Sequence, residues 1–166
     1  MSDAVDEVVA AWGRVRPELD VWPTHVVGRL KRLGHLFERE MKDFFANYGL
    51  EYWEFDVLST LRRSGGPDGL TAGGLIKTTM VTSGAITNRI DRMEAKGLVR
   101  RTPDPKDRRT VRIQLTDEGL DTIDRLMPLH VDNEIRLLGG VDRAELDQLA
   151  GLLRVLSESL GDTTLS

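Results

Sequence analysis

One polar and basic stretch in the middle of the chain decides the fold. Residues 81–111 read VTSGAITNRIDRMEAKGLVRRTPDPKDRRTV. From Thr82 onward, apolar side chains recur at helical spacing, at Ile86, Ile90 and Met93. Gly97 is placed to end this helix, and two strand-like runs, 98–102 and 110–115, then flank a tip rich in proline and arginine. The stretch predicts a helix that leads directly into a β-hairpin.

The outer face of this predicted helix differs from an ordinary solvated face rich in Glu and Lys. It carries Ser83, Thr87, Asn88 and Arg92. The donors and acceptors of these side chains match base edges and phosphates. A polar helix followed by a basic hairpin is typical of a winged helix-turn-helix, whose recognition helix enters the major groove while the hairpin, or wing, reaches the minor groove. The alternative is a surface helix beside a charged hairpin.

The charge distribution favours the winged helix-turn-helix. Residues 77–112 contain ten Lys and Arg against four Asp and Glu, a net charge of +6, in a chain whose net charge is −4. The remaining residues therefore carry −10, since −4 is the sum of +6 and −10. The chain is acidic except where DNA is expected to bind.

The composition bounds the class of protein. A chain of 166 residues, 40% hydrophobic and 30% charged, predicts one soluble globular domain. It has no run of 18 apolar residues and an acidic N-terminus, so we expect a cytoplasmic location. It has no cysteine, and its three histidines have no close partner in the sequence, so no metal site or cofactor is predicted. We find no nucleophile–base pattern or phosphate loop, which argues against an enzyme.

Apolar helical stripes surround the central stretch. They predict a short helix over 3–14, a long helix from an N-cap at Thr24 to about residue 48, a helix over 50–63, a short helix capped by Thr71, and two C-terminal helices after residue 116. Together these helices offer more apolar surface than one winged helix can cover. A homodimer is therefore expected, and its symmetry would place two recognition helices about one DNA turn apart on a palindrome.

Several segments carry a family resemblance. They are EFDVL at 54–58, the run 80–91 containing SGAITNRID, KGLV at 96–99, DPKDRR at 104–109 and LTDEG at 115–119. With these segments the chain resembles the MarR family of bacterial transcriptional regulators from about residue 24 onward. The resemblance implies an obligate dimer without enzymatic activity. It also implies a mainly α fold with a small β-hairpin wing, in which 1–48 and 117–166 dimerise and 49–116 form the DNA-binding lobe of a single MarR-type domain.

The resemblance also implies which residues contact DNA. Ser83, Thr87 and Asn88 would meet bases or phosphates in the major groove, and Arg109, held by Asp107, would enter the minor groove, with Arg108 as a near-equal candidate. An arginine at a hairpin tip suits the negative potential of a narrow minor groove. The full set of expected DNA contacts is Thr82, Ser83, Thr87, Asn88, Arg92, Lys106, Asp107, Arg108 and Arg109.

A narrower resemblance is to the urate-responsive branch of the family, which has an extra N-terminal helix with a tryptophan. It implies a site for a planar anion formed by Trp12, Asp56, Arg63 and Arg89. Asp56 paired with Arg89 would hold the recognition helix, and an anion that competes for Arg63 or Arg89 would shift the helix and lower DNA affinity. The alternative is a salt bridge from Asp56 to Arg89 or Arg63 that only stabilises the fold.

We therefore expect a ligand-responsive dimeric repressor, released from a palindromic operator by a small anion that is urate-like or a polycarboxylate. A second hypothesis is a winged-helix module that binds proteins and recognises no DNA sequence. The arginines of the wing argue against this second hypothesis, because a protein-binding wing has no need to collect them.

Overall fold

The computed structural model describes residues 2–78, 86–104, 107 and 109–164. It divides into two compact units, Met1–Gly49 and Leu50–Ser166. The described part of the chain has no helix that is both long enough and apolar enough to cross a membrane.

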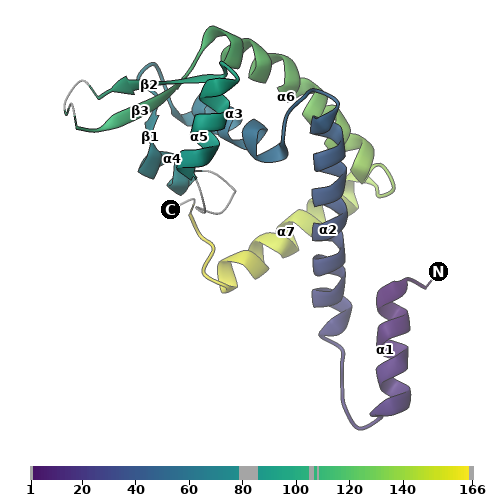
Figure 1. The fold of residues 1–166 in the computed structure, drawn as a ribbon. Helices are drawn as coiled ribbons and strands as arrows, with labels where there is room; N and C mark the ends of the chain where they lie inside the picture. Colours follow the sequence, from purple (N-terminus) through teal and green to yellow (C-terminus); the bar gives the residue numbers. More distant parts are fainter. Residues whose placement is uncertain (1, 79–85, 105–106, 108, 165–166) are drawn as a thin grey trace. The chain divides into compact units, whose positions relative to one another are not determined.

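The first unit is a pair of helices, α1 (Ala4–Val15) and α2 (Thr24–Ala46), with α1 packed along the first half of α2 (Figure 1). Val5 of α1 is buried, and a methyl group at Gly28 of α2 would lie 3.2 Å from it, so the glycine lets the two helices approach closely. Arg29 of α2 pairs with both Asp3 and Asp6, which fixes the start of α1. The predicted N-terminal helix is thus tied to α2 by packing and charge.

The predicted N-cap of α2 is wrong. Thr24 is the first helical residue, and the cap position belongs to Pro23, which makes no side-chain cap hydrogen bond. The backbone at Pro23 is already helical, with φ −60° and ψ −24°, and the amide of Thr24 donates to the carbonyl of Val21 at 3.0 Å. Because the proline ring sets φ near the helical value, the chain enters the helix through a turn rather than through a hydroxyl cap.

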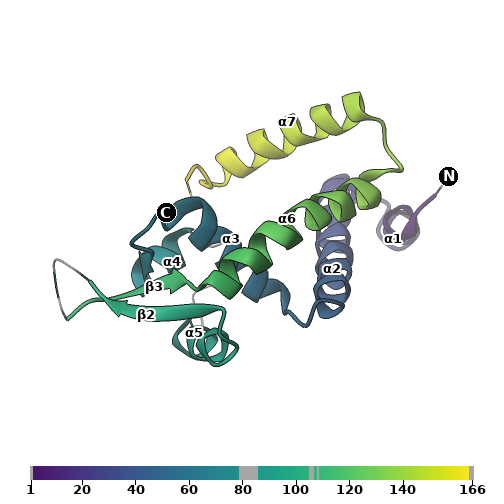
Figure 2. The same ribbon diagram turned by 90° about the horizontal axis from the view of Figure 1, so that it is seen from above.

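The second unit contains the remaining elements. They are α3 (Tyr52–Ser64), β1 (Leu70–Thr71), α4 (Ala72–Thr78), α5 (Ile86–Ala95), β2 (Val99–Pro103), β3 (Val111–Leu115), α6 (Asp117–Leu138) and α7 (Arg143–Ser159). Figure 2 shows the β2–β3 hairpin extending away from α5 and α6 of the same unit, as in Figure 1. The predicted class, mainly α with a small β wing, is confirmed.

The hairpin belongs to a small antiparallel sheet in the order β1-β3-β2. In β2 and β3, Val99 lies opposite Leu115 and Arg101 opposite Ile113, which is the predicted hairpin. The strand β1 was not predicted, because two residues are too short to show an alternating pattern. It adds the segment before α4 to the base of the wing.

The helix α4 packs on α3, and α5 packs on α4 and β2. Leu75 of α4 and Ile90 and Met93 of α5 are buried, as are Phe55, Val57, Leu58 and Leu61 of α3. Thr71 caps α4 as predicted, accepting from the amide of Gly74 at 3.0 Å. Gly97 ends α5 in a left-handed conformation, φ 73°, and the amide of Leu98 returns to the carbonyl of Met93 at 3.0 Å. The periodic apolar positions are therefore the core positions.

Candidate nucleic-acid interface and ligand cavity

The described part of the recognition helix is α5. Thr87, Asn88 and Arg92 are exposed on it, while Ile90 and Met93 face the core. The predicted contacts Thr82 and Ser83 lie outside the described residues. The exposed face of α5 thus offers a hydroxyl, an amide and a guanidinium, which are the groups that read base edges and bind phosphates.

The wing is organised around a buried carboxylate. Asp104 is 7% exposed, and it pairs with Arg112 of β3 while its backbone amide donates to the carbonyl of Thr110 at 2.8 Å. Arg112 also donates to the carbonyl of Gly69 at 3.0 Å, which links the wing to the segment before β1. Arg112 was counted among the basic residues of the wing, but its pairing makes it part of the support of the wing.

The tip of the wing is held by Asp107. Its carboxylate accepts from the backbone amide of Arg109 at 3.0 Å and from the hydroxyl of Thr110 at 3.0 Å. Asp107 therefore fixes the backbone that carries Arg109, and Arg109 itself is exposed. The other predicted tip residues, Lys106 and Arg108, lie outside the described residues.

Ion pairs also fix α5 within the lobe. Arg101 of β2 pairs with both acids of the helix, Asp91 and Glu94. Lys96, just after α5, pairs at 2.7 Å with Glu54 of α3, whose side chain is fully buried. These supports were missed by sequence reasoning, because the members of the Lys96–Glu54 pair lie 42 residues apart. They hold the recognition helix between the wing and α3.

A cavity of about 430 Å³ lies between α3 and α6. Its lining residues are Tyr52, Phe55, Asp56, Ser59, Arg62, Arg63, Ile123, Asp124, Met127, His130 and Glu134. Two of the four predicted ligand residues, Asp56 and Arg63, line it. Arg63 donates to the hydroxyl of Ser59 at 3.1 Å and to the carbonyl of Thr78, the last residue of α4, at 2.7 Å. Arg63 thus connects the cavity to the first helix of the helix-turn-helix.

The other two predicted ligand residues lie elsewhere. The Arg89 guanidinium lies 5.2 Å from the centroid of the Trp53 ring, outside the set of residues that line the cavity. Trp12 is 46% exposed on α1, in the first unit. A pairing of Asp56 with Arg89, and a place for Trp12 beside the ligand, stay predictions.

Two titratable groups in the cavity are held neutral at pH 7. Burial raises the pKa of the Tyr52 phenol, and the charges of Asp56 and Glu134 raise it further. Burial lowers the pKa of the His130 imidazole, an effect that Glu134, 3.2 Å from Nε2, partly opposes. The cavity therefore offers a phenol and a neutral imidazole beside its charged groups.

His130 is expected to make stability depend on pH. Its native pKa lies below the ordinary value of 6.5, so the native imidazole binds a proton less readily than the unfolded one. This contribution to stability is complete above pH 6.5 and is lost as pH falls below it. Urea unfolding from pH 5 to 7.5 should show a steeper loss on acidification for the wild type than for His130→Gln. Parallel curves would contradict this role.

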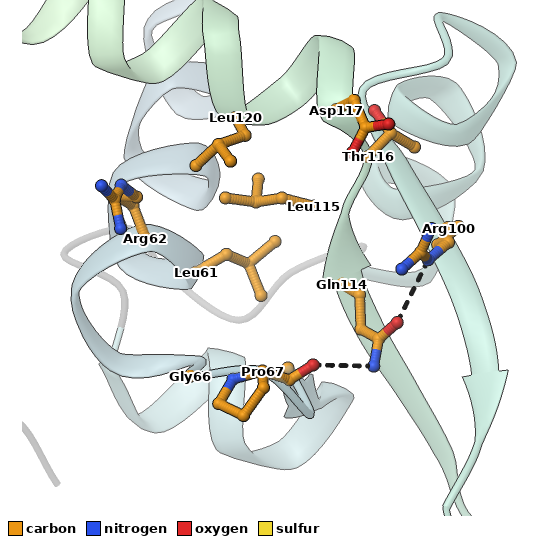
Figure 3. A pocket seen from close by; sticks show the side chains of 11 residues that line it. Leu61, Arg62, Gly66, Pro67, Arg100, Gln114, Leu115, Thr116, Asp117 and Leu120 are labelled. Carbon is orange, nitrogen blue, oxygen red and sulfur yellow. Dashed lines mark hydrogen bonds between the residues drawn. The ribbon is translucent and has the colours of Figure 1, made fainter.

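A second cavity, of about 260 Å³, lies between the end of α3, the sheet and the start of α6. Figure 3 shows Leu61 and Arg62 on one side of it, and Gln114 bonded to Pro67 and Arg100 on the other. Arg62 lines both cavities and pairs with Asp124 of α6 at 2.7 Å. Arg62 thus braces α3 against α6 and is already neutralised. Among the described residues, no group of three or more His, Asp or Glu side chains is arranged to hold a metal ion.

These elements define a winged helix-turn-helix, a class of DNA-binding protein. They follow one another along the chain as a short helix (α4), a second helix with a polar exposed face (α5) and a basic antiparallel hairpin (β2–β3). A model of the MarR family matches residues 48–110. The transcriptional regulator PecS of Dickeya dadantii is 40% identical over 149 residues, 90% of each chain. The chain therefore belongs to the MarR family of transcriptional regulators, and its relatives are regulators rather than enzymes.

Solved structures agree with this assignment. AbsC, a MarR family transcriptional regulator from Streptomyces coelicolor, is 26% identical, with a TM-score of 0.75 over 86% of this chain and 96% of that chain. BpsR of Bordetella bronchiseptica, whose DNA binding is regulated by 6-hydroxynicotinic acid, is 26% identical, with a TM-score of 0.70 over 80% of this chain and 92% of that chain. Some proteins with this fold thus respond to small molecules.

Proposed function

We propose that the protein is a homodimeric repressor that a small anionic ligand releases from a palindromic operator. The observation that carries this proposal is Arg63, which lines the cavity and donates to the carbonyl of Thr78 at the end of α4. An anion bound to Arg63 would compete with that carbonyl for the guanidinium. The helix-turn-helix would lose a bond that ties it to α3, and its preferred geometry for DNA would be less populated.

The charges of the cavity favour one kind of anion. Arg62 is paired with Asp124, so Arg63 is the cation best placed for a ligand, while Asp56 and Glu134 also line the cavity. A ligand with several carboxylates would meet these acids with repulsion. A planar anion that also carries N–H donors could bond to the acids and to Arg63 together. Of the two ligand classes expected, the urate-like class therefore fits better.

Dimerisation is supported by the apolar surface of the end helices. The helix α7 has no buried residue; Leu152 within it is 70% exposed, and Leu160, its C-cap, is 79% exposed. In α2, Val27 is 63% exposed. We propose that 1–48 and 117–166 dimerise through such faces, that 49–116 binds DNA, and that the twofold symmetry matches a palindrome. The expected DNA contacts are those given above for the recognition helix and the wing tip.

A thermal-shift screen with urate, other purines, phenolic acids and citrate-like acids tests the ligand. A ligand at a hundred times its Kd should stabilise the native state by about 2.7 kcal/mol, which raises Tm by several degrees. Arg63→Ala should abolish the thermal shift, and Asp56→Asn should reduce it. Arg143→Ala, on the exposed surface of α7, should leave the shift unchanged. If no anion raises Tm of the wild type, the ligand proposal is wrong.

A further inference from the structure

Two arginines of the recognition helix share one indole ring. The guanidinium carbons of Arg89 and Arg92 each lie 5.2 Å from the centroid of the Trp53 ring. Trp53 is the second residue of α3 and is partly buried, and the two arginines are one turn apart on α5. At this distance the negative face of an indole attracts a guanidinium, so the ring holds both side chains.

The other charged side chains of α5 are held in a different way. Asp91 and Glu94 are both paired with Arg101, and the neighbouring Lys96 is paired with Glu54. Each of these contacts neutralises a charge and uses hydrogen-bond donors. The indole contact does neither, because a π face attracts the cation without accepting its N–H groups.

We infer that Trp53 is a positioning residue for DNA binding, which holds Arg89 and Arg92 in place while leaving their charge and N–H donors available to phosphates. The inference rests on the proposed binding of DNA by α5. A carboxylate at the same place would hold the arginines equally well, but it would cancel the charge that attracts the phosphate backbone. Holding the side chains in advance also reduces the rotamer entropy lost when DNA binds.

The same end of α3 positions the helix itself. Glu54, next to Trp53, is fully buried and binds Lys96 at the end of α5, while its carboxylate also accepts from the amide of Glu51 at 2.9 Å. The start of α3 thus holds the end of the recognition helix through an ion pair, and it holds the half-buried Arg89 and the exposed Arg92 through a ring. The sequence analysis predicted no role for Trp53, because spacing does not show that its ring lies against α5.

The test measures DNA affinity by fluorescence anisotropy, using labelled duplexes that tile the intergenic region upstream of the protein's own gene and a random-sequence duplex. Trp53→Leu, which keeps an apolar side chain but removes the ring, should weaken binding by about ten-fold, and Trp53→Phe, which keeps a ring, should bind nearly as well as the wild type. The matched control is Trp22→Leu, because Trp22 is 62% exposed in the connection between α1 and α2. That variant should bind as the wild type does.

A double-mutant cycle separates positioning from a purely structural role. In the Arg89→Gln, Arg92→Gln background, Trp53→Leu should have little further effect on affinity, because the ring no longer holds a cation. Equal losses in both backgrounds, or no loss in the wild type, would overturn the inference while leaving the proposed function intact. A wild type that binds none of the duplexes would overturn both, and Tm of each variant reports whether it is folded.

Discussion

Replacing Arg109 by alanine should weaken binding to the upstream duplex by about ten-fold at moderate salt. The reason is the way the wing presents this residue. Its backbone amide is bonded to the carboxylate of Asp107, and the tip is tied through Thr110 to the buried Asp104. Because the backbone is already fixed, little ordering is needed when the guanidinium enters the negative potential of a narrow minor groove.

The salt dependence distinguishes a DNA contact from a general loss of charge. If each Arg109 releases about one counterion, Arg109→Ala should reduce the magnitude of the slope of log affinity against log salt by about 0.9 for each subunit. The control is Arg143→Ala, which removes the same charge from an exposed site on α7 where Arg143 pairs with Asp147. The assignment of the wing fails if both variants bind alike. Arg108→Ala, Arg109→Ala together should weaken binding further, since Arg108 is the second expected contact.

Much of the fold could be predicted from local patterns. Apolar periodicity located the helices, because Ile90 and Met93 in α5, and Ile123 and Leu126 in α6, repeat at the spacing that buries one face. The hairpin was visible because two short runs flank a tip that contains Pro103 and Pro105. What local patterns could not show is β1, whose two residues join the sheet only through pairing with Ile113 and Arg112 of β3.

The candidate site divides in the same way. Exposed residues expected to contact DNA, such as Asn88 and Arg109, are recognisable because their residue types are unusual for their place in the pattern. Their supports are contacts between residues far apart in the sequence, such as Arg63 with Thr78 and Trp53 with Arg92. Spacing carries no information about such pairs, so the contact of Arg89 with the Trp53 indole could not be predicted, and the ligand role of Arg89 stays a prediction.

Replacing Gly69 by alanine should cost the native state about 2–5 kcal/mol, the sum of backbone strain and a steric clash. Gly69 has φ +71°, and a methyl group there would lie 2.1 Å from the carbonyl oxygen of Ile113 and 2.7 Å from Cγ of Gln114. The contact with Ile113 cannot relax cheaply, because it is with the backbone of the buried residue at the centre of the sheet. Thermal unfolding should show Tm lowered by roughly 10 °C.

Two other glycines separate the causes of this loss. Gly66 also has a positive φ, +55°, but no atom lies within 4 Å of a methyl group there, so Gly66→Ala should cost about 1 kcal/mol from backbone strain alone. Gly73 lies in α4 with open space around it, and Gly73→Ala should be neutral or stabilise by up to about 1 kcal/mol. If Gly69→Ala lowers the free energy of unfolding no more than Gly66→Ala does, the backbone of the sheet at Ile113 must move to make room for the methyl group. Since Arg112 donates to the carbonyl of Gly69, that result would also mean that the backbone at the base of the wing can shift at a low cost in free energy, despite this hydrogen bond.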